Sequence, residues 1–247
     1  MWEGGGLWVV EATPAAARTT QRTDSHAHHA IQVTIGLGGR FQLDTADAHV
    51  RGDAAAVAPD TAHTFEAEGL VAILFIEPES RMGRAIAHAL FDTKTSTAVP
   101  SELLGDFPER IAAAYRAPAR NDDVLIAAGR ALVARMAGDR RADPPDPRIR
   151  KVIAWAGQQL DGQVSLADAV VIGKLSAGRL RHLFVEQTGL PFKTYLLWLR
   201  LMRAVERFAA GASLTEAAHE AGFSDSAHFS RTFRRMFGVA PAALRMT

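Results

Sequence analysis

The chain has 247 residues, of which 48% are hydrophobic and 22% charged, a composition typical of globular proteins and unlike that of disordered chains. This length is sufficient for two ordinary domains. There is no cysteine, which excludes disulfides, thiolate catalysis and thiolate metal sites, so a metal ion would need His, carboxylate or amide ligands.

The net charge of +1 conceals an asymmetry along the chain. Residues 148–247 carry 14 Lys+Arg and 7 Asp+Glu, a net charge of +7, whereas the remaining residues carry 14 and 20, a net charge of −6. A basic C-terminal region favours a polyanionic partner, although scattered solvated charges would give the same count. No apolar run approaches 18 residues and the start of the chain does not resemble a signal peptide, so we expect a cytoplasmic protein without membrane association.

Short strand-like segments, separated by Gly, Asp and Pro, occupy the chain from Leu7 to about Glu79. Many short strands with turns between them predict a small all-β barrel or sandwich. The segments are LWVV, AIQVTI, RFQLD, AAVAP, HTFEA and LVAILFI.

Three histidines and one glutamine form the candidate pocket of this barrel. If Ser25–Ile35 is a single strand, alternation of its side chains places His26, His28 and Gln32 on one face, and His63 follows downstream. These residues resemble the cupin pattern, in which HxH, an acid or amide, and a Gly precede a Pro-rich turn and a last His. The resemblance implies a cupin-like barrel that binds an effector or a metal. The matching residues are His26, His28, Gln32, Gly39, Pro59 and His63.

Two departures from the cupin pattern bear on a bound metal. Cupins usually have Glu where Gln32 stands and Gly where Asp60 stands. A neutral amide is a poor ligand for a hard divalent ion, but His26, His28 and His63 together could hold zinc or nickel. A polar pocket lining that descends from a metal site, or three exposed strand histidines, would account for the same residues.

After Pro78 the apolar spacing changes to about 3.6 residues, which predicts helices. Asn121 or Asp122 is the expected N-cap of the third helix. Small residues dominate that helix, so it is a candidate for a homodimer contact or for packing on its own barrel. The charged, proline-rich residues 138–147 predict a linker. The three helices are expected at Arg81–Phe91, Ser101–Tyr115 and Asp123–Met136.

One long amphipathic helix is predicted at Pro191–Ala210, with Pro191 in its first turn and Gly211 just past its end. A further helix is expected at Arg148–Leu160. At 1.5 Å per residue, 20 residues span roughly 30 Å, close to the separation of about 34 Å between successive major grooves on one side of B-DNA.

Two similar units flank this long helix, each consisting of a Ser cap, a short helix, a tight turn, another Ser cap and a second helix. Ser213 and Glu216 predict a capping box, and Ser224 is the expected cap of the last helix. Phenylalanines at 229, 233 and 237 recur every four residues and must face a core. The side chains left on the outer faces, Gly178, Arg181 and His182 in the first unit and Ser226, Ala227, Ser230 and Arg231 in the second, are candidates for contacts with bases or phosphates.

The stretch GFSDSAHFSRTFRRMFGVAPAALR resembles the characteristic motif of the AraC/XylS family of bacterial transcription regulators, and the two units with the long helix correspond to that family's DNA-binding domain. The resemblance implies two helix-turn-helix units that enter adjacent major grooves, preceded by a cupin-like domain. The expected fold is α+β, with an effector-binding and dimerisation domain at 1–137, a linker at 138–147 and an all-α DNA-binding domain at 148–247. In the first unit, Lys174 stands where the turn normally has Gly, so we expect an irregular turn there.

We therefore expect a DNA-binding transcription regulator controlled by a small molecule or metal, and not an enzyme. The alternative is a metal-dependent cupin enzyme with a fused helical domain, which Gln32 at the acid position and the lack of an evident acid–base pair disfavour. Expected partners are double-stranded promoter DNA, an effector, a second copy of the chain in a homodimer, and RNA polymerase.

Overall fold

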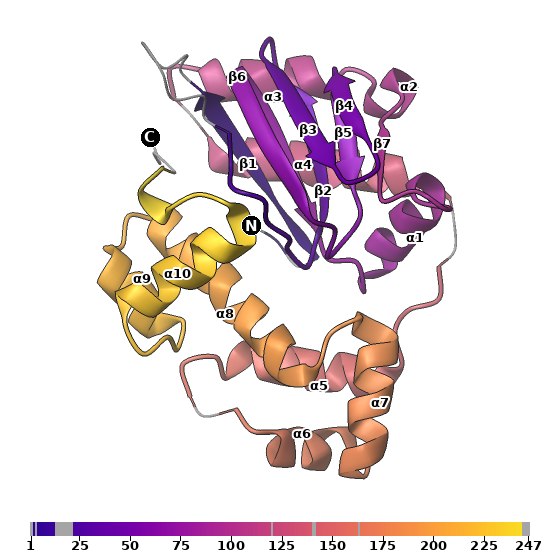
Figure 1. Ribbon diagram of the computed structural model, residues 1–247, viewed down its shortest axis with the longest axis vertical. Coiled ribbons are helices and arrows are strands. Elements are labelled where there is room, and N and C mark those ends of the chain that lie inside the picture. Colours follow the sequence, from indigo (N-terminus) through magenta and orange to yellow (C-terminus); the bar gives the residue numbers. More distant parts are fainter. Residues whose placement is uncertain are drawn as a thin grey trace. The chain divides into compact units, whose positions relative to one another are not determined.

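The computed structural model describes residues 2, 4–12, 22–119, 121–139, 142–162 and 164–243 (Figure 1). The chain forms two compact units, the first running to Ala142 and including Met236–Val239, and the second running from Asp143 to Arg235 and resuming at Ala240. The first combines an antiparallel sheet with helices and the second is helical, so the predicted α+β class is confirmed.

Antiparallel strands in the order β4-β3-β6-β2-β5-β7, with β1 also paired to β6, form a near-closed barrel in the first unit. The long strand β6 belongs to both halves of this barrel, because residues 63–68 pair with β3 and residues 69–76 pair with β1. Gly69 lies between these two halves with a φ of 76°. The strands are β1 Gly5–Ala12, β2 Ile31–Gly36, β3 Arg40–Thr45, β4 His49–Gly52, β5 Ala54–Val57, β6 His63–Ile76 and β7 Ser96–Ala98.

Two strand predictions were wrong. The segments HTFEA and LVAILFI were expected as separate strands but form the single strand β6, because Gly69 bends the strand without ending it. The expected strand Ser25–Ile35 begins only at Ile31, so His26 and His28 lie in the extended segment that precedes β2.

The helices of the first unit follow β6, and Figure 1 shows α3 and α4 behind the sheet. The expected single helix Ser101–Tyr115 is wrong, since Gly105 has a φ of 58° and separates α2 from α3. Asn121 is the N-cap of α4 and accepts a hydrogen bond from the backbone of Asp123. The helices are α1 Arg81–Leu90, α2 Ser101–Leu104, α3 Phe107–Arg116 and α4 Asp122–Ala137.

The small residues of α4 divide between two faces. Ala128 and Gly129 are buried, and a Cβ added at Gly129 would lie 2.9 Å from the ring of Trp2, so this face packs within its own unit. Ala127, Ala131 and Ala134 lie on the exposed face. The core beneath the helices is formed by odd-numbered residues of β2 together with apolar residues of β6, α1, α3 and α4, including Ile31, Val33, Ile35, Leu74, Ile86, Ile111 and Leu132.

The second unit is built around the predicted long helix, α8, which is unbroken over 18 residues. Pro191 is its N-cap instead of lying within its first turn, and Gly211 follows the helix with a φ of 94°. None of the helices among the described residues has the length and hydrophobicity needed to cross a membrane. The elements are α5 Pro147–Gln158, α6 Leu166–Gly173, α7 Ala177–Thr188, α8 Phe192–Ala209, α9 Leu214–Glu220, α10 Ser226–Phe237 and the 3₁₀ helix Pro241–Ala243.

Candidate functional site

The first helix-turn-helix unit consists of α6 and α7. Ser165 caps α6 and forms a reciprocal capping box with Asp168. The turn that follows is regular, contrary to our expectation, because Lys174 itself adopts the left-handed conformation, with φ 50° and ψ 46°. Ser176 then caps α7 by accepting a hydrogen bond from the backbone of Arg179 at 3.3 Å.

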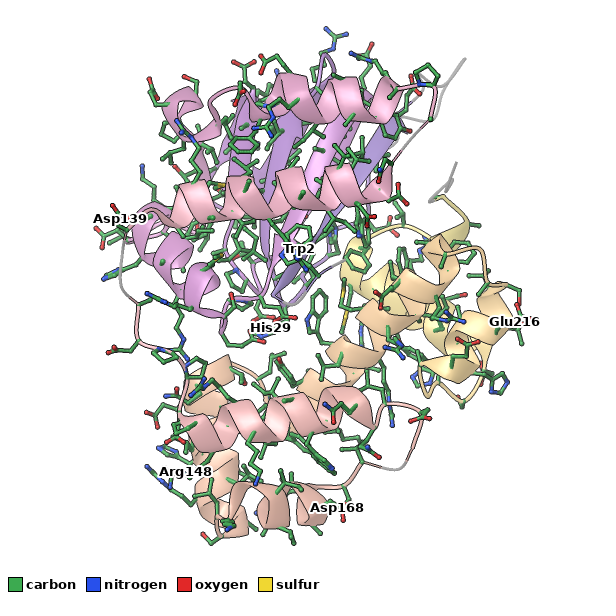
Figure 2. The ribbon with its side chains drawn as sticks, turned by 180° about the vertical axis from the view of Figure 1, so that it is seen from behind. Trp2, His29, Asp139, Arg148, Asp168 and Glu216 are labelled. Carbon is green, nitrogen blue, oxygen red and sulfur yellow. The ribbon has the colours of Figure 1, made fainter. Side chains whose placement is uncertain are left out.

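The second unit consists of α9 and α10. Ser213 and Glu216 form the predicted capping box; Figure 2 labels Glu216 and its counterpart in the first unit, Asp168. The prediction that Ser224 caps α10 was wrong. Asp225 does so, since its Oδ1 accepts a hydrogen bond of 2.6 Å from the backbone of His228, while the Ser224 hydroxyl donates to Asp225 Oδ2 at 2.9 Å.

The outer face of each second helix is polar and accessible. On α7, Gly178, Arg181 and His182 are exposed, opposite the buried side chains of Leu180 and Phe184. These positions are therefore available to a ligand as large as DNA.

On α10, Ala227 and Arg231 are exposed and Ser226 and Ser230 are partly buried, while Phe229 and Phe233 on the other side are fully buried. Ala227 and Arg231 thus lie on the side of α10 that faces away from the core, whereas Ser226 and Ser230 lie at the margin of that side. An arginine and two serines on one face can donate to both phosphates and base edges.

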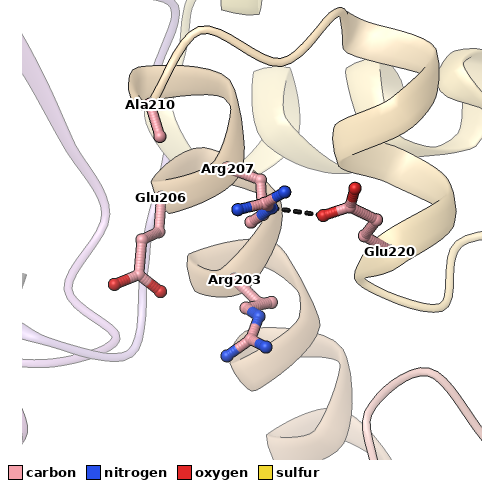
Figure 3. A pocket seen from close by; sticks show the side chains of 5 residues that line it. All are labelled: Arg203, Glu206, Arg207, Ala210 and Glu220. Atoms are coloured by element: carbon pink, nitrogen blue, oxygen red, sulfur yellow. Dashed lines mark hydrogen bonds and ion pairs between the residues drawn. The ribbon is translucent and has the colours of Figure 1, made fainter.

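Helix α8 and its neighbours are held together by arginines. Arg200 of α8 donates to the backbone carbonyls of Leu160 and Gly162, at 3.3 and 3.1 Å, and so fixes the segment after α5. Near the C-terminal end of α8, Arg207 forms an ion pair with Glu220 of α9 (Figure 3). That pair borders a surface pocket lined by Arg203, Glu206, Arg207, Ala210 and Glu220. Along the chain, α7 ends just before α8 and α9 begins just after it, so a helix-turn-helix unit adjoins each end of α8.

The barrel brings His26, His28 and His63 together, with one nitrogen from each within 4.8 Å of the others. All three are buried, which excludes the interpretation as exposed strand histidines. His26 and His63 face each other across a backbone bridge, through hydrogen bonds of 3.0 and 2.9 Å in the two directions. Gln32 is buried beside them, its Oε1 2.9 Å from His28 Nε2 and its Nε2 3.1 Å from Thr34 Oγ1.

Burial controls the charge of this cluster. Burial, followed by the nearby imidazole of His63, lowers the pKa of His26 to about 4 and that of His28 to about 3. Burial also lowers the pKa of His63. The three imidazoles are therefore neutral near pH 7, and each has one protonated nitrogen and one lone pair.

A fourth histidine, His29, lies beside the cluster in the opposite charge state. Burial alone would lower its pKa, but hydrogen bonds and charge from Asp60 and Glu79 outweigh burial and raise the pKa to about 9. Its Nδ1 is 3.0 Å from Asp60 Oδ2 and its Nε2 is 3.5 Å from Glu79 Oε2. The cation therefore belongs to an ion-paired group next to the cluster, and not to the cluster itself.

Sequence reasoning missed this ion-paired group. Asp60 has a φ of 57°, which explains why a Gly suits that position in the pattern, and its carboxylate stabilises His29. Glu79 lies just after the Pro that ends the strand region, and no local pattern links it to a histidine 50 residues away along the chain. The sequence signal for this group was the presence of a further histidine, His29, directly after the HxH motif.

Comparison with known proteins yields similarities over the C-terminal region. Residues 173–247 match a family model described as a helix-turn-helix domain. Over 110 residues the chain is 37% identical to the uncharacterized HTH-type transcriptional regulator YidL of Escherichia coli K12, covering 44% of this chain and 37% of YidL. Over 99 residues it is 36% identical to the HTH-type transcriptional activator RhaS of E. coli strain SE11, covering 40% of this chain and 36% of RhaS. The chain thus matches little more than a third of the length of these relatives.

The similarity of fold extends over the whole chain. The structure resembles that of ToxT from Vibrio cholerae O395 with a TM-score of 0.61 and 12% identity, covering 98% of this chain and 97% of ToxT. ToxT of strain SCE256 with a bound unsaturated fatty acid gives a TM-score of 0.57 and 11% identity, covering 98% and 96%. At these identities the likeness concerns the fold alone, and it confirms a near-closed barrel followed by a helical domain with helix-turn-helix units.

Proposed function

Because the C-terminal domain of this chain is a helix-turn-helix domain of the AraC/XylS type, we propose that the protein binds double-stranded promoter DNA through this domain and regulates transcription there. The observation that carries the proposal is the pair of capped units attached to the two ends of one unbroken helix. Each unit presents a polar outer face on its second helix.

The length of α8 suits simultaneous binding to two grooves. Its 18 residues span about 27 Å at 1.5 Å per residue, and with the units at its ends the helix approaches the groove separation of about 34 Å. Helices α7 and α10 would each enter a major groove. Arg181 and Arg231 are the side chains able to make bidentate contacts with guanine, while Ser226 and Ser230 supply donors for phosphates.

The two units contribute unequally to sequence recognition in this proposal. Gly178 provides no side chain on the outer face of α7, which leaves Arg181 and His182 as its readers. His182 also lies 3.9 Å from Glu186, an acidic neighbour that opposes phosphate contact. The second helix-turn-helix unit, with Arg231 and two serines, is therefore the stronger contributor to sequence recognition.

Quantitative DNA binding tests the proposal. We would select a duplex from a random pool with the full-length protein and measure its affinity by fluorescence anisotropy at several salt concentrations. Phosphate-dominated binding predicts that affinity falls steeply as salt rises, and Arg231→Ala should weaken it by roughly 5- to 150-fold, from about 1–3 kcal/mol for a bidentate base contact.

The matched control is Arg110→Ala, which removes an exposed arginine from α3 in the N-terminal compact unit. Its affinity should equal that of the unchanged protein. Equal affinity in Arg231→Ala, or affinity independent of salt, would contradict the proposed role of α10.

For the N-terminal compact unit, which contains the barrel, we propose effector binding and dimerisation. The predicted effector-binding residues His26, His28, Gln32 and His63 support a binding role because these polar side chains are buried together. The exposed face of α4, with Val124 half exposed at 50%, is the proposed dimer contact. Ala131→Arg should shift the sedimentation of a dimer toward a monomer, whereas Ala128, being buried, is not part of this test.

The relatives matched over the C-terminal region are named as transcriptional regulators and not as enzymes. Within the barrel, the carboxylate that a metal-dependent cupin enzyme would use is replaced by Gln32, whose Oε1 is 2.9 Å from His28. No observation favours the enzyme alternative.

A further inference from the structure

The ring nitrogens of the histidine cluster are oriented by carbonyl oxygens. His26 Nδ1 lies 2.9 Å from the backbone oxygen of Asp24, and His63 Nδ1 lies 2.8 Å from that of Thr61. A carbonyl oxygen only accepts hydrogen bonds, so both Nδ1 atoms carry the proton and donate. The Nε2 atom of each ring therefore presents a lone pair.

For His28, the same reasoning places the proton on Nε2 instead of Nδ1. Gln32 donates through its Nε2 to Thr34 at 3.1 Å, which places its Oε1 toward His28 Nε2 at 2.9 Å. His28 Nε2 then carries the proton and donates to this oxygen, and Nδ1 has the lone pair.

The cluster thus offers one lone pair from each of three buried imidazoles. His63 Nε2 is buried and makes no hydrogen bond within the described part of the chain, although a buried acceptor is normally satisfied. One nitrogen from each ring lies within 4.8 Å of the others, whereas nitrogens bound to one tetrahedral zinc ion lie about 3.4 Å apart.

We propose that His26, His28 and His63 bind a single divalent transition-metal ion of the zinc type, with Gln32 as a positioning residue outside the coordination sphere. The inference deepens the proposed effector role of the N-terminal compact unit. Its meaning for regulation rests on that proposed role. It departs from the sequence pattern, in which position 32 supplies a ligand, because the Gln32 oxygen is already engaged by His28.

The chemistry of the ligands selects the ion. Imidazole suits zinc, nickel, cobalt and copper, whereas magnesium and calcium require oxygen ligands. No carboxylate belongs to this cluster among the residues that the structure describes. Histidines that bind metals usually donate their second ring N–H to a carbonyl or carboxylate, and all three histidines here do so to a carbonyl oxygen.

The ion would also link two separate parts of the barrel. His26 and His28 precede β2, while His63 begins β6, and the backbones of the two segments meet in the bridge between His26 and His63. A ligand that binds only the folded state stabilises it in proportion to the logarithm of its concentration over Kd. Zinc should therefore raise the melting temperature of the full chain.

Amide substitutions allow a test that preserves the supporting hydrogen bonds. Asn places a donor near the position of His Nδ1, so His26→Asn and His63→Asn retain donation to the carbonyls but lose Nε2. Gln places a donor near His Nε2, so His28→Gln retains donation to Gln32 but loses Nδ1. The matched control is His49→Asn, because His49 lies on the same barrel, is 80% exposed and is outside the cluster.

The measurement is equilibrium dialysis of the untagged, chelator-stripped full chain against Zn²⁺, with Mg²⁺ in parallel, followed by elemental analysis. We expect one zinc and no magnesium per chain in the unchanged protein and in His49→Asn, and at least ten-fold weaker zinc binding in each cluster variant. Zinc content well below one per chain, or unchanged binding in the three variants, would overturn the proposal.

Cobalt tests the role assigned to Gln32. Gln32→Leu should weaken Co²⁺ binding by about 10- to 100-fold, as loss of an outer-sphere partner does, and the visible absorption bands at saturation should keep their positions. Gln32→Glu, which retains an acceptor for His28, should restore the affinity. Bands that shift in Gln32→Leu would show that Gln32 is a ligand and would contradict its positioning role.

DNA binding by the stripped protein separates this inference from the proposed function. Salt-dependent DNA binding without zinc binding refutes the metal site alone. Zinc binding without DNA binding refutes the proposed function and leaves the metal site supported.

Discussion

Lys174 and Gly222 occupy equivalent positions in the two helix-turn-helix units, and both adopt positive φ, at 50° and 78°. Each follows the first helix of its unit and reverses the chain toward the second. Equivalent backbone hydrogen bonds close both turns, from Leu175 N to Val170 O at 3.3 Å and from Phe223 N to Ala218 O at 2.9 Å. The turn thus requires the left-handed conformation in both units, and only one of them has the residue that adopts it without strain.

We predict that Lys174→Gly stabilises the first helix-turn-helix unit by about 1 kcal/mol, because the left-handed conformation costs a residue with a Cβ roughly that amount. Hydrogen exchange of peptides spanning α6 and α7 would report the change as slower exchange. Lys174→Ala is the matched control and should leave exchange nearly unchanged, since Ala has the same backbone cost. Faster exchange in the Gly variant would mean that Lys174 makes contacts that outweigh its strain.

Gly222 should tolerate no side chain. A Cβ at this position would lie 2.1 Å from the backbone oxygen of Leu160, so Gly222→Ala must displace the segment that Arg200 holds. We expect a loss of roughly 2–4 kcal/mol, measured by urea unfolding monitored by circular dichroism. Gly178→Ala is the control, because nothing lies within 4 Å of its added Cβ, and it should raise stability by up to about 1 kcal/mol. Similar midpoints for the two variants would contradict the close approach.

The cap of α10 can be tested with two neighbouring substitutions. Asp225→Ala removes the acceptor for the backbone of His228 and should cost about 1 kcal/mol, whereas Ser224→Ala should cost less than about 0.5 kcal/mol. Thermal melts of both variants at one pH would rank them. A larger loss in Ser224→Ala would return the capping role to the serine.

Asp146, the N-cap of α5, predicts a dependence on pH. Hydrogen bonds from the Arg148 side chain and backbone lower its pKa to about 2. The folded-state pKa lies below the unfolded value of about 3.9, so this stabilisation is present above pH 4 and is lost as pH falls toward 2. Asp146→Ala should cost about 1 kcal/mol at pH 7, and the difference from the unchanged protein should shrink between pH 4 and 3 in urea titrations.

Asp161→Ala removes an exposed carboxylate from the same unit and serves as the control for this titration. It should differ little from the unchanged protein at either pH. A deficit in Asp146→Ala that stays constant from pH 7 to pH 3 would show that the carboxylate charge contributes nothing to the cap.

The capping boxes illustrate what could be predicted locally. Ser213 and Glu216 are three residues apart, and their reciprocal hydrogen bonds need only one helical turn. The cap of α10 was predicted wrongly because the second turn is one residue longer than the first: Ser176 follows Lys174 by two residues, while Asp225 follows Gly222 by three. Repetition of Ser between the units suggested an equivalence that the backbone does not maintain.

The sequence by itself determined the class of fold, the long helix and the residues on the outer faces of α7 and α10, because helical periodicity and caps act over a few residues along the chain. Tertiary structure alone decided that three histidines are buried with one ring nitrogen of each close to the others, and that His29 is instead a paired cation. These properties depend on partners 30 or more residues away, such as Asp60 for His29 and His63 for His26, and on the burial of the imidazole rings.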